Sequence, residues 1–316
     1  VEQGGLAHVR SSEQGDTATN RIVEDFTRES FAYLDDNLAV VGNGGFGEVE
    51  RLSADPLTVQ YTLFDNLTWS DGTPVTLDDL LFGWAVHSGW FDDAAYDQDG
   101  NIVSGTRYFD VAASTDGIRD TKRARIDRSE WTLTLVYDEP FADWNREWLV
   151  DLPVHTVAER AGVGVDDLVK AIRTAAKGDP MQPVEPNPVL LAAAQAWNTA
   201  FDAASTDPAI ATANGPYTAS TWSADEVVLL KRDGYVGNHE PIADRIVVRT
   251  YPDEEALQAA LVEGEIDVAN IGEATSAEIG RLQAADLTVD TGARPSIVAL
   301  MFTEGEGALS TAVREA

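Results

Sequence analysis

The sequence predicts a mixed α/β protein of more than one lobe, and three observations support this prediction. Residues 57–63 alternate apolar and polar side chains, the period of a half-buried strand, and a helix-start signal follows near residue 76. Between residues 227 and 271, strand patterns and a helix pattern follow one another, which is typical of α/β layers. The chain has 316 residues, which exceeds the length at which single cores usually divide into domains.

The segment 63–79, LFDNLTWSDGTPVTLDD, contains the most local information in the chain. Its Ser-Asp-Gly sequence is turn chemistry, its proline fixes an extended step, and Thr76 precedes Asp79 at the spacing of a capping box. A strand therefore enters this segment and a helix leaves it. We expect the indole to close the core under the turn and the Asp71 carboxylate to accept backbone N–H groups. The residues with predicted structural roles here are Trp69, Asp71, Gly72, Pro74 and Asp79.

Periodicity and turn residues predict the other elements. They are, in chain order, a helix at 20–34, a strand at 131–137, helices at 165–176 and 189–204, strands at 227–231 and 245–251, a helix at 254–263 and a strand at 266–271. Gly264 is expected to end the helix that precedes it. The proline-rich stretch 178–188 is predicted to be a surface connection.

The composition excludes several classes of function. The formal net charge is −32, from 54 acidic against 22 basic residues, so nucleic acid and an anionic bilayer would be repelled. Cysteine is absent, which excludes disulfides, thiolate metal sites and cysteine nucleophiles. The four histidines lack metal-ligand spacing, so we predict neither a metal nor a cofactor. No stretch approaches the roughly 20 apolar residues that span a bilayer.

Three short motifs are better explained as ordinary turns and helix. Residues 42–47 fit GxGxxG, but a dinucleotide site needs a helix N-terminus next, and the chain instead runs into a strand. Residues 97–101 look like a calcium loop, but the Gly stands at the fourth position instead of the sixth. His87-Ser88-Gly89 lacks the preceding Gly of a nucleophile elbow, because Val86 occupies that place.

Rigid aromatic residues at strand ends are the best candidates for ligand contact, because binding clefts use apolar faces with a few polar groups. Tyr217 follows Gly215 and Pro216, and Tyr251 precedes Pro252 at the end of a predicted strand. We expect both rings to border one concave surface. Packing in the core is the alternative for each of them.

Several runs, in their order along the chain, resemble the oligopeptide- and dipeptide-binding family of solute-binding proteins that serve ABC importers. Residues 69–79 are similar to the family's WsDGtPvTAdD, with Leu in place of the usual Ala. Residues 214–217, NGPY, and the stretch 227–269 resemble the family's GPY run and the run from rNpdYwg to GeiD. Weaker matches lie at 151–155, like lmPkH, and at 296–316, where Thr follows the Phe in place of the usual Asn.

The resemblance implies a periplasmic-binding-protein-like fold of type II, with mixed β-sheets flanked by helices. It implies a first lobe at 1–267 and only the beginning of a second lobe at 268–316, because family members continue well beyond this point. Gly264 and Asp267 would mark the passage between lobes, and hinge closure would trap the solute. The residues that would contact the ligand are Asp16, Thr17, Trp90, Phe91 and Tyr96, together with Tyr217 and Tyr251.

The function that the resemblance implies is capture of a peptide or similar small solute outside the cytoplasm, without catalysis. Delivery would be to the membrane permease subunits of an ABC importer, and a lipid anchor removed from this sequence would hold the protein at the membrane. An enzyme is the alternative, for example a glycoside hydrolase with paired carboxylates and tryptophan sugar platforms. A binding protein used in signalling or scaffolding would share the fold.

Overall fold

The computed structural model describes residues 17–291 except 36, 38, 113, 114, 116, 147, 148, 151, 200–211, 224, 272 and 273. The helices are α1 (Ala18–Thr27), α2 (Leu77–His87), α3 (Val154–Ala161), α4 (Val165–Thr174), α5 (Pro188–Thr199), α6 (Glu254–Val262) and α7 (Ser276–Ala284), with a 3-10 turn η1 (Ile118–Asp120). The strands are β1 (Ala32–Leu34), β2 (Val40–Gly42), β3 (Gly47–Ala54), β4 (Leu57–Leu63), β5 (Ala95–Tyr96), β6 (Ile102–Ser104), β7 (Arg125–Asp127), β8 (Thr132–Val136), β9 (Tyr217–Trp222), β10 (Glu226–Lys231) and β11 (Arg245–Arg249). The predicted mixed α/β class is confirmed.

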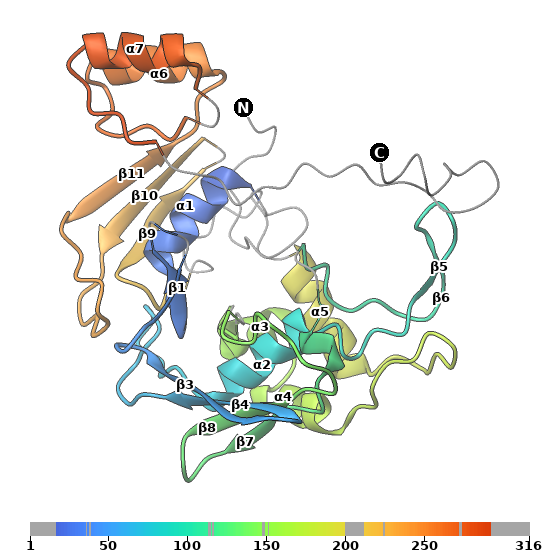
Figure 1. Cartoon of the computed structure of the whole chain (residues 1–316). Helices are drawn as coiled ribbons and strands as arrows, with labels where there is room; N and C mark the ends of the chain where they lie inside the picture. The colour runs from blue at the N-terminus through green and yellow to red at the C-terminus, as the bar shows by residue number, and fades with distance from the viewer. Residues whose placement is uncertain are drawn as a thin grey trace.

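The larger module is a four-stranded antiparallel sheet in the order β3-β4-β8-β7, with helices α2 to α5 on one face (Figure 1). Strand β4 matches the predicted strand at 57–63, and its residues alternate between buried and half-buried. Its inward side chains, among them Val59 and Tyr61, join a continuous hydrophobic core with the helices. The alternation in the sequence therefore places one face of the sheet in the core of this module.

Helix α2 is the central helix of the larger module, and nine of its residues are buried. It begins as predicted, because the Thr76 side chain and the Asp79 side chain form a reciprocal capping box. Asp79 Oδ1 also accepts a hydrogen bond of 2.9 Å from the backbone N–H of Val154, at the start of α3. One carboxylate thus caps α2 and fixes the helix that packs beside it. Burial raises the pKa of Asp79 above its ordinary value, against these hydrogen bonds.

Gly83 lets the main chain at Leu149 approach helix α2 closely, and a substitution of Gly83 tests this packing directly. A Cβ at Gly83 would lie 2.1 Å from the carbonyl oxygen of Leu149, whereas a Cβ at Gly280 in α7 would meet nothing within 4 Å. We expect Gly83→Ala to lower the free energy of unfolding by about 1 to 3 kcal/mol through overpacking. Gly280→Ala should instead raise helix stability by about 0.5 to 1 kcal/mol, because a helical Gly loses more chain entropy than Ala.

Urea unfolding followed by circular dichroism measures the first variant, and amide hydrogen exchange in α7 measures the second. The two variants introduce the same methyl group into two helices, so they differ in the space around it. Equal effects of the same sign at Gly83 and Gly280 would contradict the close approach of Leu149.

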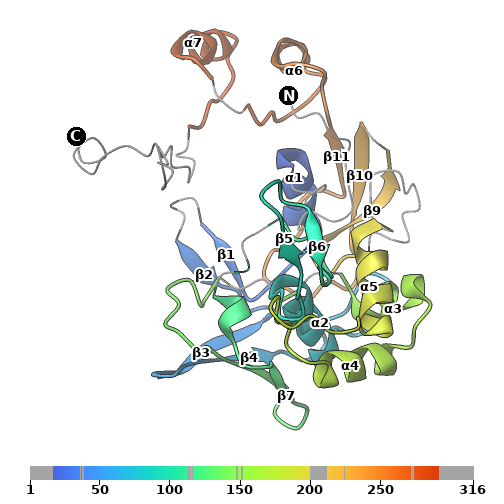
Figure 2. The same cartoon turned by 90° about the vertical axis from the view of Figure 1, so that its right-hand side faces the viewer.

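The smaller module consists of the antiparallel sheet β11-β10-β9 with α1 packed on it (Figure 2). A second hydrophobic cluster forms here, and α1 contributes Val23, which is 3% exposed. Strands β10 and β11 and helix α6 match the predicted elements at 227–231, 245–251 and 254–263. Gly264 ends α6 with φ at +74°, a conformation that favours Gly, so the predicted stop is confirmed.

Two predicted elements differ from the structure. The helix predicted at 20–34 ends at Thr27, and residues 32–34 form β1, paired with β2. The reason is that the apolar residues of this stretch pack in two different cores. Val23 packs in the core of the smaller module, and Phe31 packs in the core of the larger module. Residues 266–271 form no strand, and Val268 is 85% exposed, so this alternation has no face to bury.

Some strands were not predicted because their sequences lack an apolar face. Strand β3 is an edge strand with a mostly exposed, charged sequence, and it pairs with β4. The hairpin β5–β6 is short and largely exposed, and a turn at 97–101 closes it, as predicted for that stretch.

Helices α6 and α7 lie beyond the end of the β9–β11 sheet in both views (Figures 1 and 2). Each has a single buried residue, Ala260 in α6 and Leu282 in α7. The division into lobes at residues 267 and 268 stays a prediction. Within the predicted second-lobe segment, residues 272, 273 and 292–316 lie outside the described residues.

Candidate functional site

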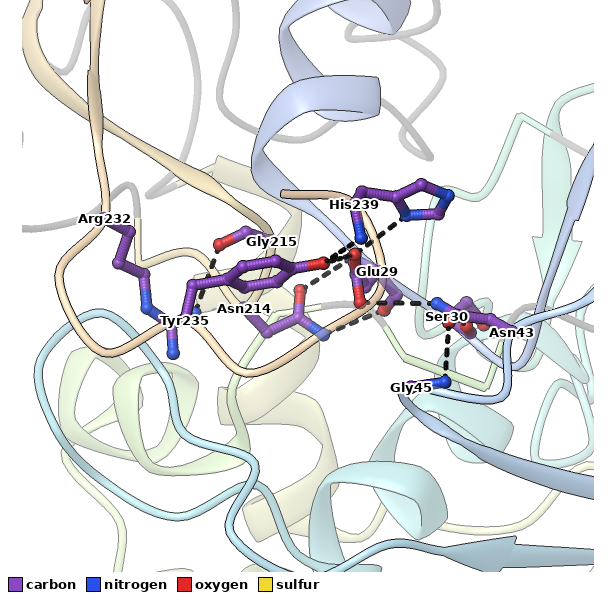
Figure 3. Close-up of polar contacts among 9 residues, drawn as sticks. All are labelled: Glu29, Ser30, Asn43, Gly45, Asn214, Gly215, Arg232, Tyr235 and His239. Atoms are coloured by element: carbon purple, nitrogen blue, oxygen red, sulfur yellow. Dashed lines mark hydrogen bonds and ion pairs between the residues drawn. The ribbon is translucent and has the colours of Figure 1, made fainter. Parts of the chain in front are cut away.

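A polar cluster around the buried carboxylate of Glu29 joins the larger and the smaller module, and we call it the Glu29 junction (Figure 3). It lies where the chain leaves α1, enters β9 and turns between β10 and β11. Its side chains come from four segments that are distant in the sequence, and they are Glu29, Asn43, Asn214, Arg232, Tyr235 and His239.

Glu29 is 7% exposed, and its carboxylate accepts hydrogen bonds from three side chains. The Tyr235 hydroxyl donates to Oε1, and His239 Nδ1 lies 3.0 Å from the same oxygen. Asn43 Nδ2 lies 3.3 Å from Oε2. Burial, and next the hydrogen bond to Glu29, raise the pKa of Tyr235 above its ordinary value, so the phenol stays protonated and donates at neutral pH. A buried carboxylate with these donors is satisfied, and it ties loop 232–239 to the end of α1.

The two asparagines of the junction hold the main chain around Glu29. Asn214 Oδ1 accepts from the Glu29 N–H at 3.0 Å, and its Nδ2 donates to the Glu29 carbonyl at 2.8 Å. Asn43 Nδ2 donates to the Ser30 carbonyl at 3.0 Å, and its Oδ1 accepts from the Gly45 N–H at 3.1 Å. The two side chains therefore satisfy main-chain groups of Glu29 and Ser30, which lie outside helix and strand.

Arg232 is buried, and its guanidinium donates to carbonyl and hydroxyl oxygen atoms. Its Nη1 donates to the Ala213 and Gly215 carbonyls at 3.4 and 3.2 Å, and its Nη2 donates to the carbonyl and hydroxyl of Thr68 at 2.5 and 2.8 Å. Burial lowers the pKa of Arg232 from its ordinary value. The guanidinium thus connects the turn before Trp69 with the segment that leads into β9.

The turn at 68–74 makes further contacts that explain two of the sequence runs. Asp71 Oδ1 accepts from the Thr73 N–H at 2.9 Å, as predicted for turn chemistry. Asp71 Oδ2 lies 2.7 Å from His155 Nε2, at the start of α3. Ser70 N–H donates to the Ala213 carbonyl at 2.7 Å. The run at 69–79, the run at 151–155 and the run at 214–217 therefore meet in space.

The Asp71 contacts predict how stability depends on pH. Partial burial acts to raise the pKa of Asp71, but the Thr73 hydrogen bonds and His155 outweigh burial and lower it from 3.8. A folded-state pKa below the unfolded value means that ionised Asp71 stabilises the fold above about pH 4, and that this stabilisation is lost as the pH falls through the folded value.

Asp71→Asn should therefore be less stable than the parent at neutral pH, and the difference should shrink below about pH 4. Urea midpoints measured at intervals from neutral to acid pH test this. A difference that stays constant over the whole range would contradict the role assigned to the ionised carboxylate.

The structure places the predicted ligand-contact residues in different surroundings. Trp90 and Phe91 are 6% and 5% exposed and belong to the larger core, and Tyr217 is 4% exposed and belongs to the smaller one. Tyr251 is half-buried, and Tyr96 is half-exposed in β5. These residues are not gathered around one point, and ligand contact by any of them stays a prediction.

The remaining predicted contact residues belong to the N-terminal loop. Thr17 is the N-cap of α1, since its side chain accepts from the Asn20 N–H at 3.2 Å. Asp16 lies outside the described residues. Among the residues with structural roles, Trp69 is 1% exposed in the larger core, as expected. Gly72 has φ at +88°, Pro74 forms an isolated bridge with Thr68, and Gly215 approaches the backbone of α1 too closely for a Cβ.

Sequence reasoning missed the Glu29 junction, although four of its members lie in the two runs at 214–217 and 227–269, and these are Asn214, Arg232, Tyr235 and His239. Glu29 stood in a predicted helix, where an acidic residue usually faces solvent. In the described part of the chain, no group of three or more His, Cys, Asp or Glu residues is placed to hold a metal ion. Nor does any described helix have the length and apolar character needed to cross a membrane.

Comparison with known proteins gives a consistent picture. The profile of "Bacterial extracellular solute-binding proteins, family 5 Middle" matches residues 47–316. An uncharacterised lipoprotein of Mycobacterium leprae (strain TN) is 28% identical over 297 residues, which is 87% of this chain and 47% of that protein. A lipoprotein of Mycobacterium tuberculosis (strain ATCC 25618 / H37Rv) is 27% identical over 263 residues, 80% of this chain and 42% of that protein.

Two solved structures show the fold that these similarities indicate. The periplasmic EDTA-binding protein EppA has a TM-score of 0.68 at 20% identity, over 90% of this chain and 45% of that chain. The oligopeptide-binding protein AppA from Bacillus subtilis, solved with a nonapeptide, has a TM-score of 0.53 at 14% identity, over 84% of this chain and 41% of that chain.

This chain spans about half the length of the relatives and structures reported above. Its fold is that of the periplasmic-binding-protein-like class of type II, as predicted. Because the family profile covers most of the chain, the chain belongs to the family 5 bacterial extracellular solute-binding proteins.

Proposed function

We propose that the protein that contains this chain captures a peptide, or a solute of similar size, outside the cytoplasm and delivers it to the permease subunits of an ABC importer. The observation that carries this proposal is the family match over residues 47–316. Structural relatives that bind an oligopeptide and EDTA support solutes of this size. The lipoprotein relatives support attachment to the membrane surface through a lipid anchor.

The contribution of this chain is a rigid platform made of two modules. The Glu29 junction, in which Arg232 binds the Thr68 carbonyl of the larger module, holds the modules together through polar contacts. A binding lobe whose parts keep their relative position loses little conformational entropy when a solute binds. Ligand contact would involve the half-buried Tyr251, which follows β11, with the second lobe closing over the solute.

Binding assays on two proteins test the proposal. The natural protein that contains this chain, and the 316-residue chain itself, are screened by thermal shift against peptides, sugars and metal chelates. Isothermal titration with a mixed tripeptide library then follows. We expect micromolar or tighter binding by the natural protein and no high-affinity binding by the 316-residue chain. Absence of binding by the natural protein to every class would contradict the proposal.

The glycoside hydrolase alternative receives no support from the described carboxylates. The buried ones are Glu29, Asp79 and Asp93, and each accepts hydrogen bonds from the protein itself. A hydrolase needs two carboxyl groups that face the scissile bond. Release of reducing sugar from a glycoside panel by the natural protein would favour this alternative.

A further inference from the structure

Asparagine is followed by glycine at two places in the chain, Asn43-Gly44 and Asn214-Gly215, and the fold brings both to Glu29. Asn43 is 3% exposed and Asn214 is 6% exposed. In a flexible chain, Asn before Gly loses its side-chain amide most readily, because Gly has no Cβ to hinder the attack of its backbone nitrogen. We propose that these two asparagines are spontaneous modification sites, and that deamidation of either one opens the Glu29 junction irreversibly.

The reaction needs water and no other reactant. The backbone nitrogen of the Gly attacks the side-chain carbonyl carbon of the Asn, which closes a five-membered imide ring and releases the side-chain nitrogen as ammonia. Water then opens the ring at one of its two carbonyl groups. The product is aspartate, or isoaspartate with the main chain routed through the side chain. The net change is the loss of ammonia and the gain of a carboxylate, with no oxidation or reduction.

The closed junction restrains both sites against this reaction. The attacking nitrogen of Gly215 donates its proton to the Thr27 carbonyl at 2.9 Å. The Asn214 amide is held at both ends by the main chain of Glu29. The Asn43 amide is held by Glu29, by the Ser30 carbonyl and by the Gly45 N–H. The side chains cannot rotate onto the neighbouring nitrogen until these hydrogen bonds break, so the reaction reports local opening.

The product cannot rebuild the junction, because deamidation replaces a hydrogen-bond donor with an acceptor at the contact with Glu29. Asn214 Nδ2 donates to the Glu29 carbonyl, and Asn43 Nδ2 donates to Glu29 Oε2 and the Ser30 carbonyl. After deamidation a carboxylate oxygen stands in place of each donor and faces another oxygen. The new charge adds to a net charge of −32, which offers little compensation. Deamidation of one asparagine therefore frees the second asparagine to react, and the opened junction does not form again.

Peptide mapping by mass spectrometry, after incubation at mildly alkaline pH, measures deamidation at each site. We expect both sites to react much more slowly in the native chain than in the same chain in urea. Tyr235→Phe removes the hydroxyl donor to Glu29 and should raise both rates on the order of tenfold. Tyr33→Phe is the matched control, because Tyr33 contacts the His239 ring and the same change leaves the donors to Glu29 in place. It should leave both rates unchanged.

Coupling between the sites is the second test. Asn214→Asp installs the product at one site, and the rate at Asn43 should then rise towards the rate in urea. Asn198→Asp is the control, because Asn198 bridges Asp110 and Tyr108 by the same pair of backbone hydrogen bonds, far from Glu29 in the sequence. Equal native and urea rates at both sites would overturn the proposal. So would unchanged rates in Tyr235→Phe, or an Asn43 rate in Asn214→Asp that equals the parent rate.

Discussion

Trp69→Ala is expected to lower the free energy of unfolding by about 3 to 5 kcal/mol. The indole is 1% exposed and belongs to the largest side chains of the larger core. Its removal leaves a cavity beneath the turn at 68–74, which a surface turn cannot fill by collapse. Urea unfolding followed by circular dichroism gives the change in free energy.

Two control variants separate packing from hydrogen bonding and from exposure. In the described structure the Trp69 Nε1 atom has no hydrogen-bond partner, so Trp69→Phe loses volume alone and should cost about 1 to 2 kcal/mol. Trp131 is 42% exposed, and Trp131→Ala should stay within about 1 kcal/mol of the parent. If Trp69→Ala unfolds like the parent but the natural protein that carries it no longer binds solute, Trp69 is a ligand contact instead.

Arg232→Ala is expected to lower the free energy of unfolding by about 3 kcal/mol. The substitution removes a buried side chain and leaves the carbonyl groups of Thr68 and Gly215 without the guanidinium donors that satisfy them, whereas the Ala213 carbonyl keeps the Ser70 N–H. Buried carbonyl groups without donors pay their full desolvation cost in the folded state. The same urea experiment measures the change.

Arg232→Lys tests whether the forked shape of the guanidinium matters. A lysine keeps the charge but has one ammonium group, which cannot reach acceptors on both sides of the fork. We expect the free energy of unfolding of Arg232→Lys to lie between those of the parent and Arg232→Ala. Stability equal to the parent would show that charge alone, without the fork, holds the turn and the segment before β9 together.

The sequence predicted the elements whose signals are local. The capping box of Thr76 and Asp79 and the alternation at 57–63 act over a few residues, and the structure confirms both. Trp69 was expected in the core because a large apolar ring beside a polar turn is buried by packing beneath that turn. Such features need no knowledge of distant parts of the chain.

The Glu29 junction was not predictable because its partners are far apart in the sequence. Glu29 and Asn214 are separated by 185 residues. A Glu after an apolar stripe indicates a solvent-facing helix residue, and an Asn before Gly indicates a turn. Only the meeting of the two modules brings these residues together in one network around the buried Glu29 carboxylate. The end of α1 at Thr27 was missed for the same reason, since Phe31 packs in a core that later residues build.

The division of the chain between two cores has a consequence for its synthesis. Helix α1 ends at Thr27, but the sheet that buries Val23 begins only at Tyr217, so the helix is made well before its partner. At ribosomal speeds the 185 residues between Glu29 and Asn214 take roughly 10 to 40 s to appear. During that interval the larger module can complete its own core while the apolar stripe of α1 has no partner. The nascent chain therefore exposes the apolar stripe of α1 to chaperones, and this helix is buried long after it is made.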